Sequence, residues 1–116
     1  MAIEIDVARA LNLLEIVVEK AGEDYVYPGA QYYCSYVEDG KPSCLVGRAL
    51  HLAGLGVGEL ADMDDAWPPT IDEVTLPEGV NVTPEARVVL RAAQKEQDWG
   101  KTWGEALAVA KELAEE

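Results

Sequence analysis

The residues best suited to chemistry lie together on one short predicted helix. Ser43 is expected to cap a helix that runs from Cys44 to about Ala53. At about 100° per residue, Cys44, Arg48 and His51 fall on one side of this helix, and apolar residues cover the other side. A helix N-terminus and a nearby cation both favour a thiolate over a thiol. The pattern therefore makes Cys44 a candidate nucleophile or redox-active thiol.

The same spacing limits what this face can do. Cys44 and His51 are separated by about 10 Å along the helix axis, which is too far for direct proton transfer. The structural interpretation is that Cys44 packs beneath a tyrosine-rich hairpin, Arg48 pairs with a carboxylate and His51 caps a carbonyl group. We expect this structural arrangement and a non-enzymatic protein, and we keep a thiol-dependent enzyme or redox protein as the alternative.

The cysteines suggest two further sites. Cys34, Cys44 and His51 offer two thiolates and an imidazole, which are ligands that zinc prefers. A structural zinc site needs a fourth ligand, and the chain has no Cys-x-x-Cys or His-x-x-x-His spacing to supply it. A disulfide between Cys34 and Cys44 is the other option, although a cytosolic chain keeps its thiols reduced. We expect no cofactor, with the metal site and the disulfide as alternatives.

A second feature of the chain is the distribution of its charge. Residues 51–86 contain eight acidic residues and no Lys or Arg, so this acidic segment carries −8 of the net charge of −13. The acids are Glu59, Asp62, Asp64, Asp65, Asp72, Glu73, Glu78 and Glu85. Because no counter-ion is nearby in the sequence, the segment must face water, meet cations from elsewhere in the fold, or meet a basic partner.

The part of the acidic segment around Trp67 is the candidate surface for a partner protein. It consists of Glu59, Asp62, Asp64, Asp65, Trp67, Asp72 and Glu73. A solvated face is the commonest meaning of such a charge run, and the spacing of the acids does not match a calcium-binding EF-hand loop. The functional alternative is contact with a basic protein, including mimicry of a phosphate array.

A basic ridge follows the acidic segment and can neutralise part of it. Arg87, Arg91 and Lys95 recur every four residues on a predicted helix. The default expectation is that this ridge folds back on the acidic segment within one chain, and the alternative is a contact across a symmetric homodimer.

Size and composition exclude several classes of protein. The 116 residues, of which 49% are hydrophobic, are typical of one globular domain over residues 1–116. The net charge of −13 repels nucleic acid and anionic membranes, so direct binding to either is not expected. No apolar run approaches the ~20 residues that cross a bilayer, and the N-terminus has no basic region of a signal peptide. The sequence therefore predicts a cytoplasmic protein.

The elements that position these residues are predicted to be mainly helical. Helices are expected over about 7–21, 44–53, 59–63 and 84–98, and from 102 towards the C-terminus. Asp6 and Thr83 are suited to cap two of them, and Thr102 with Glu105 matches a capping box for the last. The helices over 7–21, 44–53 and after 102 should form the core. The helix over 84–98 should be partly exposed.

Short β-hairpins are expected between the helices. One turns at Pro28-Gly29 and joins 25–27 to 31–37, after which Asp39-Gly40 turns the chain again. Another pairs 74–76 with 80–82. Trp99 should reach Trp103 across the joint between the last two helices. The predicted fold is thus a compact, mainly α domain with about four to five helices and one or two small β-hairpins.

Several short motifs carry a resemblance. They are Cys34-Ser35-Tyr36, Gly40-Lys41-Pro42-Ser43-Cys44-Leu45-Val46-Gly47-Arg48, Ala93-Gln94, Gln97-Asp98-Trp99-Gly100 and Trp103-Gly104-Glu105-Ala106. With them the chain resembles, from Ala8 to Ala110, small uncharacterised proteins encoded by phages of actinobacteria and by their hosts. The resemblance implies a protein of the bacterial cytoplasm that acts inside the host rather than a part of the virion shell. It implies no particular activity.

The leading hypothesis is a small acidic protein-binding module that modulates a basic or nucleic-acid-binding host protein. The acidic segment would be the contact surface. The alternatives are a thiol-dependent enzyme or redox protein that uses Cys44, and a self-associating structural module joined by the basic ridge and the acidic segment.

Overall fold

The computed structural model describes residues 2–28, 35–66 and 70–115, and this part of the chain forms five helices and two small sheets. The helices are α1 (Val7–Ala21), α2 (Leu45–Ala53), α3 (Val57–Asp64), α4 (Pro84–Asp98) and α5 (Trp103–Ala114). The strands are β1 (Ile3–Ile5), β2 (Val37–Glu38), β3 (Lys41–Pro42) and β4 (Val80–Val82). The predicted mainly α fold with small β elements is confirmed.

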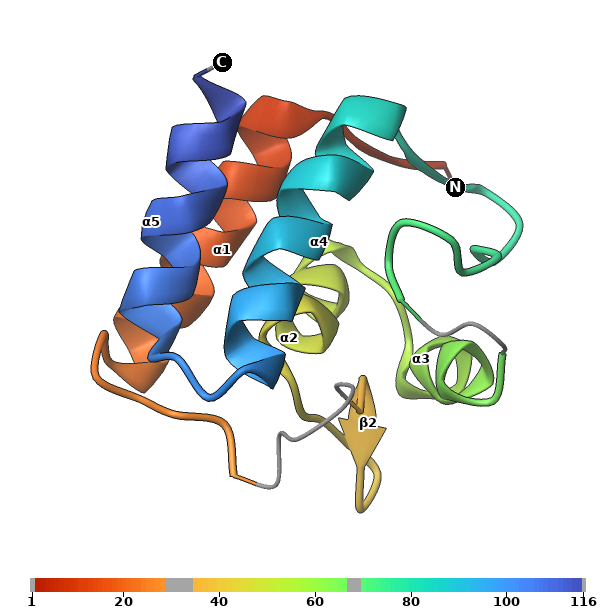
Figure 1. Cartoon of the computed structure of the whole chain (residues 1–116). Coiled ribbons are helices and arrows are strands. Elements are labelled where there is room, and N and C mark those ends of the chain that lie inside the picture. The colour runs from red at the N-terminus through yellow and green to blue at the C-terminus, as the bar shows by residue number, and fades with distance from the viewer. Residues whose placement is uncertain (1, 29–34, 67–69, 116) are drawn as a thin grey trace.

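Three of the helices form a layer. Helices α1, α4 and α5 lie side by side, and α5 runs opposite to the other two (Figure 1). Helix α2 packs across α1 and α4, while α3 lies beside the hairpin of β2 and β3. No helix in the described part of the chain is both long enough and apolar enough to span a membrane.

The helices begin where short-range capping predicts. Asp6 starts α1 by accepting a hydrogen bond from the Arg9 amide at 2.8 Å. Thr102 and Glu105 form the predicted capping box at the start of α5, and Thr83 caps α4. These caps supply partners for first-turn amides that have no intrahelical acceptor. The predicted caps of α1, α4 and α5 are therefore confirmed.

One of the predicted hairpins is wrong. Strands β2 and β3 form an antiparallel hairpin around the expected Asp39-Gly40 turn. Strand β4, however, pairs in parallel with β1, with Ile3 opposite Val80. The predicted pairing of 74–76 with 80–82 fails because the apolar N-terminal strand supplies the partner instead.

The other predicted hairpin falls largely on residues that the structure does not describe. Its turn and most of its second arm belong to residues 29–34, which are outside the described part. In its first arm, Val26 forms an isolated antiparallel bridge with Thr102, next to the start of α5.

Helix α4 has one exposed face and one face buried in the core. It buries Ala86, Val89, Leu90, Ala93, Gln94, Gln97 and Asp98 and packs against α1, α2 and α5. Helix α5 buries Trp103, Ala106 and Ala110. The prediction of a partly exposed helix over 84–98 is confirmed, since Pro84, Glu85, Val88 and Lys95 are exposed. Its buried face includes two glutamines, which find hydrogen bond partners there.

Those glutamines hold the loops around them. Gln97 Oε1 accepts a hydrogen bond from the Leu45 amide at 2.8 Å, and Gln94 Oε1 accepts one from the Ile71 amide at 3.0 Å. Gln94 Nε2 also donates to the Tyr36 hydroxyl at 3.1 Å. Buried polar groups in proteins are nearly always paired in this way. Helix α4 thus positions both the start of α2 and the segment that follows α3.

Trp99 and Trp103 do not pack together as predicted. Trp103 is fully buried, with the Tyr25 ring 4.5 Å away in an edge-on arrangement and the Tyr27 ring 6.5 Å away. Trp99 is 74% exposed and does not stack on Trp103. The expected contact of the two tryptophans is therefore wrong, and Trp103 instead contacts Tyr25, Tyr27 and the Arg48 guanidinium.

Gly47 brings α2 against the segment before β2. A Cβ atom at this position would lie 2.5 Å from the Tyr36 carbonyl oxygen and 2.8 Å from Tyr36 Cα. These are backbone atoms, so they cannot rotate away as the end of a side chain could. Only glycine allows this close approach.

We predict that Gly47→Ala lowers the free energy of unfolding by about 1–3 kcal/mol or more, because the extra methyl group overpacks a rigid contact. Gly58→Ala is the matched control, since a Cβ there would have no heavy atom within 4 Å. It should raise stability by about 0.5–1 kcal/mol through better helix propensity. Urea denaturation of both variants measures the difference, and equal effects would contradict the contact.

Asp98 gives the fold a pH dependence. Burial raises the pKa of Asp98 above its ordinary value of 3.8, and the hydrogen bond from Gln97 Nε2 offsets this only in part. Because the folded protein then holds this proton to higher pH than the unfolded chain does, stability from this group is lost as pH rises. The loss begins near 3.8 and is complete above the folded pKa.

We predict that Asp98→Asn removes this loss. The stability of the variant relative to the wild type should rise as pH increases from below 3.8 through the folded pKa, and then level off. Chemical denaturation at a series of pH values measures the difference. A relative stability that stays constant, or falls, across this interval would show that burial does not disfavour the Asp98 carboxylate.

Candidate functional site

Cys44 faces the core rather than solvent. It is the N-cap of α2, one residue later than the predicted cap Ser43, and its Sγ accepts a hydrogen bond from the Gly47 amide at 3.3 Å. The side chain is fully buried. The thiol therefore serves as a helix cap, and a substrate has no path to it in this conformation.

The Arg48 side chain has an unexpected set of partners. Its Nε donates to the Ser43 carbonyl oxygen at 2.9 Å, and its guanidinium carbon lies 4.8 Å from the Trp103 ring and 5.6 Å from the Tyr25 ring. No ion pair joins it to a carboxylate in the described ranges. The expected carboxylate partner is replaced by a carbonyl and two aromatic faces, which hold the guanidinium in one orientation.

His51 caps a carbonyl group, as the structural interpretation predicted. Its Nδ1 lies 2.9 Å from the Leu55 carbonyl oxygen. Because a carbonyl oxygen only accepts hydrogen bonds, Nδ1 carries the proton. This leaves Nε2 as the ring nitrogen that can make another contact. In the neutral ring Nε2 is an acceptor, and in the protonated ring it is a donor.

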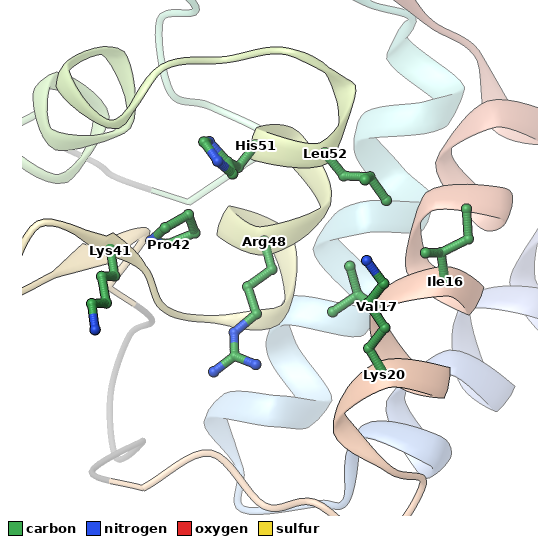
Figure 2. Close-up of a pocket in the computed structure, with 8 residues that line it drawn as sticks. All are labelled: Ile16, Val17, Lys20, Lys41, Pro42, Arg48, His51 and Leu52. Atoms are coloured by element: carbon green, nitrogen blue, oxygen red, sulfur yellow. The ribbon is translucent and has the colours of Figure 1, made fainter.

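Arg48 and His51 belong to a pocket of about 410 Å³ between α1, α2 and β3 (Figure 2). Figure 2 shows the α1 residues on one side, the β3 residues on the other and the α2 residues between them. Its charged and polar lining residues are Lys20, Lys41, Arg48 and His51. Its apolar lining residues are Ile16, Val17, Pro42 and Leu52. We call this site the cationic pocket.

The composition of the cationic pocket is unusual for this chain. It collects three of the nine Lys and Arg residues and the only histidine of a protein whose net charge is −13. Among the described residues, none that lines the pocket is acidic. The cationic pocket is therefore a local positive site on a negative molecule.

Helix α1 separates the cationic pocket from acidic side chains. A second pocket, of about 430 Å³, is lined by Glu15, Val18, Glu19, Glu23, Leu107 and Lys111. Glu15 pairs there with Lys111 at 3.5 Å. The acids of α1 thus gather towards α5, and Lys20 lies on the side that faces α2.

Sequence reasoning found only part of the cationic pocket. It placed Arg48 and His51 on one helix face but missed Lys20, Lys41 and the apolar residues of α1. No local pattern marks those residues, because the α1 residues lie more than twenty positions before Lys41, and Lys41 lies on a different element from Arg48. Cys44, which only the alternative hypothesis placed in a site with Arg48 and His51, is fully buried in the core.

The acidic segment is partly used to hold the fold. Both Asp64 carboxylate oxygens accept backbone hydrogen bonds, from the Tyr36 amide at 2.8 Å and the Val37 amide at 3.0 Å. Glu59 accepts from the Gly56 amide at 2.9 Å and so caps α3. Burial raises the pKa of Asp64, and the two amides offset part of that rise. These two acids are structural parts of α3 and its contact with the hairpin.

The remaining predicted surface residues have different environments. Asp72 lies 3.8 Å from Arg91 Nε in an ion pair, while Asp62, Asp65 and Glu73 are exposed and form no ion pair with any residue in the described ranges. Trp67 lies outside the described residues.

The basic ridge folds back within the chain, as expected, but mostly onto carbonyl groups. Arg87 Nη1 donates to the Val74 carbonyl oxygen at 2.9 Å, and Arg91 makes the ion pair with Asp72. Lys95 is exposed. The ridge therefore fixes the segment after α3 and neutralises little of its charge.

The metal and disulfide hypotheses depend on Cys34, which lies outside the described residues. Within the described ranges, no group of three or more His, Cys, Asp and Glu side chains is arranged to hold a metal ion. Cys44 is a free cysteine.

Comparison with family models, curated proteins and solved structures gives no significant match to this chain.

We predict that Cys44 resists alkylation in the folded protein. In a Cys34→Ser background, a thiol reagent should label Cys44 only after denaturant unfolds the chain, because the side chain is fully buried. Labelling followed by mass spectrometry across a pH series measures this. Fast labelling of the native protein at a pH below the ordinary thiol pKa of about 8.5 would contradict it and would restore the case for an activated thiol.

Proposed function

We propose that the protein is a non-enzymatic binding module that contacts a basic surface of another protein through the exposed acids of its acidic segment. In line with the resemblance of its motifs, we propose that it is phage-encoded and modulates a basic or nucleic-acid-binding protein in the bacterial cytoplasm. The observation that carries the proposal is that some acids in and next to α3 hold the structure together while others are exposed.

Within α3, some acids build the support and others are displayed. Glu59 caps the helix and Asp64 ties it to the β2–β3 hairpin. Leu60 and Met63 are buried beneath it. Asp62 and Asp65, three residues apart, are exposed on the side of α3 away from these two residues. A firmly attached helix thus presents two carboxylates with no counter-ion in the described part of the chain.

The electrostatics favour a basic partner. Only two ion pairs form in the described ranges, Arg91 with Asp72 and Lys111 with Glu15. Most of the excess negative charge therefore remains available to steer a positively charged surface towards the protein, and such steering increases association rates. Direct nucleic-acid binding would need the opposite sign of charge.

The alternatives have less support. A thiol-dependent enzyme would need Cys44 to meet its substrate, and Cys44 is a buried helix cap. A self-associating module would need the basic ridge to be free, and Arg87 and Arg91 are already engaged within the chain.

We predict that neutralising the displayed acids abolishes partner recovery. The test variant is Asp62→Asn, Asp65→Asn and Glu73→Gln, which leaves the structural acids Asp64 and Asp72 intact. In a pull-down from a nuclease-treated actinobacterial lysate, the immobilised variant should retain at least tenfold less partner protein than the wild type. The reason is that the contact depends on these charges. Quantitative mass spectrometry of the recovered proteins measures the effect.

The matched control is Glu4→Gln, Glu19→Gln and Glu112→Gln, which changes the net charge by the same amount at exposed sites outside the acidic segment. It should recover partner as the wild type does. Recovery should also fall as salt rises, since the screening length shortens to about 3 Å at 1 M. Equal loss in both triple variants would mean that bulk charge, rather than this surface, governs the binding.

A further inference from the structure

We propose that the cationic pocket binds a small organic phosphate monoester with an apolar body. This site is separate from the acidic surface of the proposed function and shares no residue with it. Three features support this binding: cations without carboxylate partners in the described ranges, the fixed orientation of Arg48 and the apolar wall beside it.

The cations of the pocket lack counter-ions. None of the three, Lys20, Lys41 and Arg48, forms an ion pair with a carboxylate in the described ranges. The residues outside those ranges bring only one acidic side chain, Glu116, because 29–34 and 67–69 contain no Asp or Glu. In a chain with 22 acids, three cations of one pocket that have no carboxylate partner in the described ranges can take up an external anion.

Arg48 is prepared to receive such an anion. Its Nε is held by the Ser43 carbonyl oxygen, and its guanidinium lies over the Trp103 ring at 4.8 Å. These contacts leave the terminal nitrogens as donors in a planar fork, which is the geometry that matches phosphate oxygens. Because the orientation is fixed before binding, little side-chain entropy is lost when the anion arrives.

Lys20 and Lys41 add to the positive charge of the cationic pocket. They come from α1 and β3 on opposite sides of Arg48 (Figure 2). Together the three side chains carry a charge of +3, which suits the double negative charge of a phosphate monoester better than the single charge of a carboxylate. Lysine ammonium groups reach such oxygens as flexible point charges.

The apolar wall indicates that the ligand is more than inorganic phosphate. Ile16, Val17, Pro42 and Leu52 line the same pocket. Its volume of about 410 Å³ lies at the small end of the range for ligand sites, which is about 300–1,000 Å³. A phosphate group on an aromatic or short aliphatic body would place its charge on the cations and its body against this wall.

The excess negative charge of the whole protein does not prevent this binding. At about 0.15 M salt the screening length is about 8 Å, so distant carboxylates act weakly on an anion in the pocket. The three cations line the pocket itself, so they act on a bound anion at shorter range than distant carboxylates do.

Phenyl phosphate is the test ligand, with binding followed by isothermal titration calorimetry and by amide chemical shifts in NMR spectra at physiological salt. We expect binding in the millimolar range or tighter, with shifts concentrated at Lys20, Lys41 and residues 48–52. Inorganic phosphate should bind at least fivefold more weakly, because it leaves the apolar wall unused. Benzoate should also bind at least fivefold more weakly, because it carries one charge.

The variant Lys20→Gln, Lys41→Gln should weaken phenyl phosphate binding about tenfold, from two partly exposed charge contacts. Lys95→Gln, Lys101→Gln is the matched control, because it removes two exposed cations outside the pocket and should leave the affinity unchanged. These variants alter exposed residues, so they avoid the structural role of Arg48.

Three results would overturn the proposal. The first is that phenyl phosphate shows no saturable binding at concentrations up to about 10 mM, which is the range of very weak sites. The second is that both double variants weaken binding equally. The third is that benzoate binds more tightly than phenyl phosphate. None of these results bears on partner recovery through Asp62 and Asp65, so this proposal and the proposed function fail separately.

Discussion

The start of α2 depends on one buried hydrogen bond between segments 52 residues apart, from the Leu45 amide to Gln97 Oε1. First-turn amides of a helix have no intrahelical acceptor, and this one is shielded from water. Left unpaired, it would cost on the order of 1–3 kcal/mol. Gln94, one turn earlier on α4, holds Ile71 and Tyr36 in the same way. The positions of α2, of its residue Arg48 and of the hairpin before it all follow from these two amide side chains.

This arrangement separates charges that the sequence mixes. Helix α1 places Glu15 and Glu19 towards α5 and Lys20 towards α2. Helix α3 uses Asp64 to hold the hairpin and leaves Asp62 exposed. As a result, a strongly acidic chain has both an acidic surface and a pocket with no acidic lining residue. Each can bind a partner of opposite sign because the fold places the two sets of charges on different elements.

Local signals predicted much of the fold. The caps at Asp6, Thr83 and Thr102 were predictable because each cap satisfies an amide within three residues. The prediction failed where a partner is distant. No local pattern marked Gln94 and Gln97 as buried residues, because the hydrogen bond partners that allow their burial come from distant loops. Strand β4 was assigned to the wrong partner for the same reason, since β1 lies at the other end of the chain.

The sequence by itself determined the helices, their caps, the net charge and the placement of Arg48 and His51 on one side of α2, because all of these depend on residues within a few positions of each other. Only the tertiary structure decided which side chains meet. It buried Cys44, stacked Arg48 on Trp103, tied Asp64 to the hairpin and brought Lys20 and Lys41 to the same pocket. The physical reason is that burial and long-range hydrogen bonding are properties of the packed whole, and neither has a signature in the neighbouring sequence.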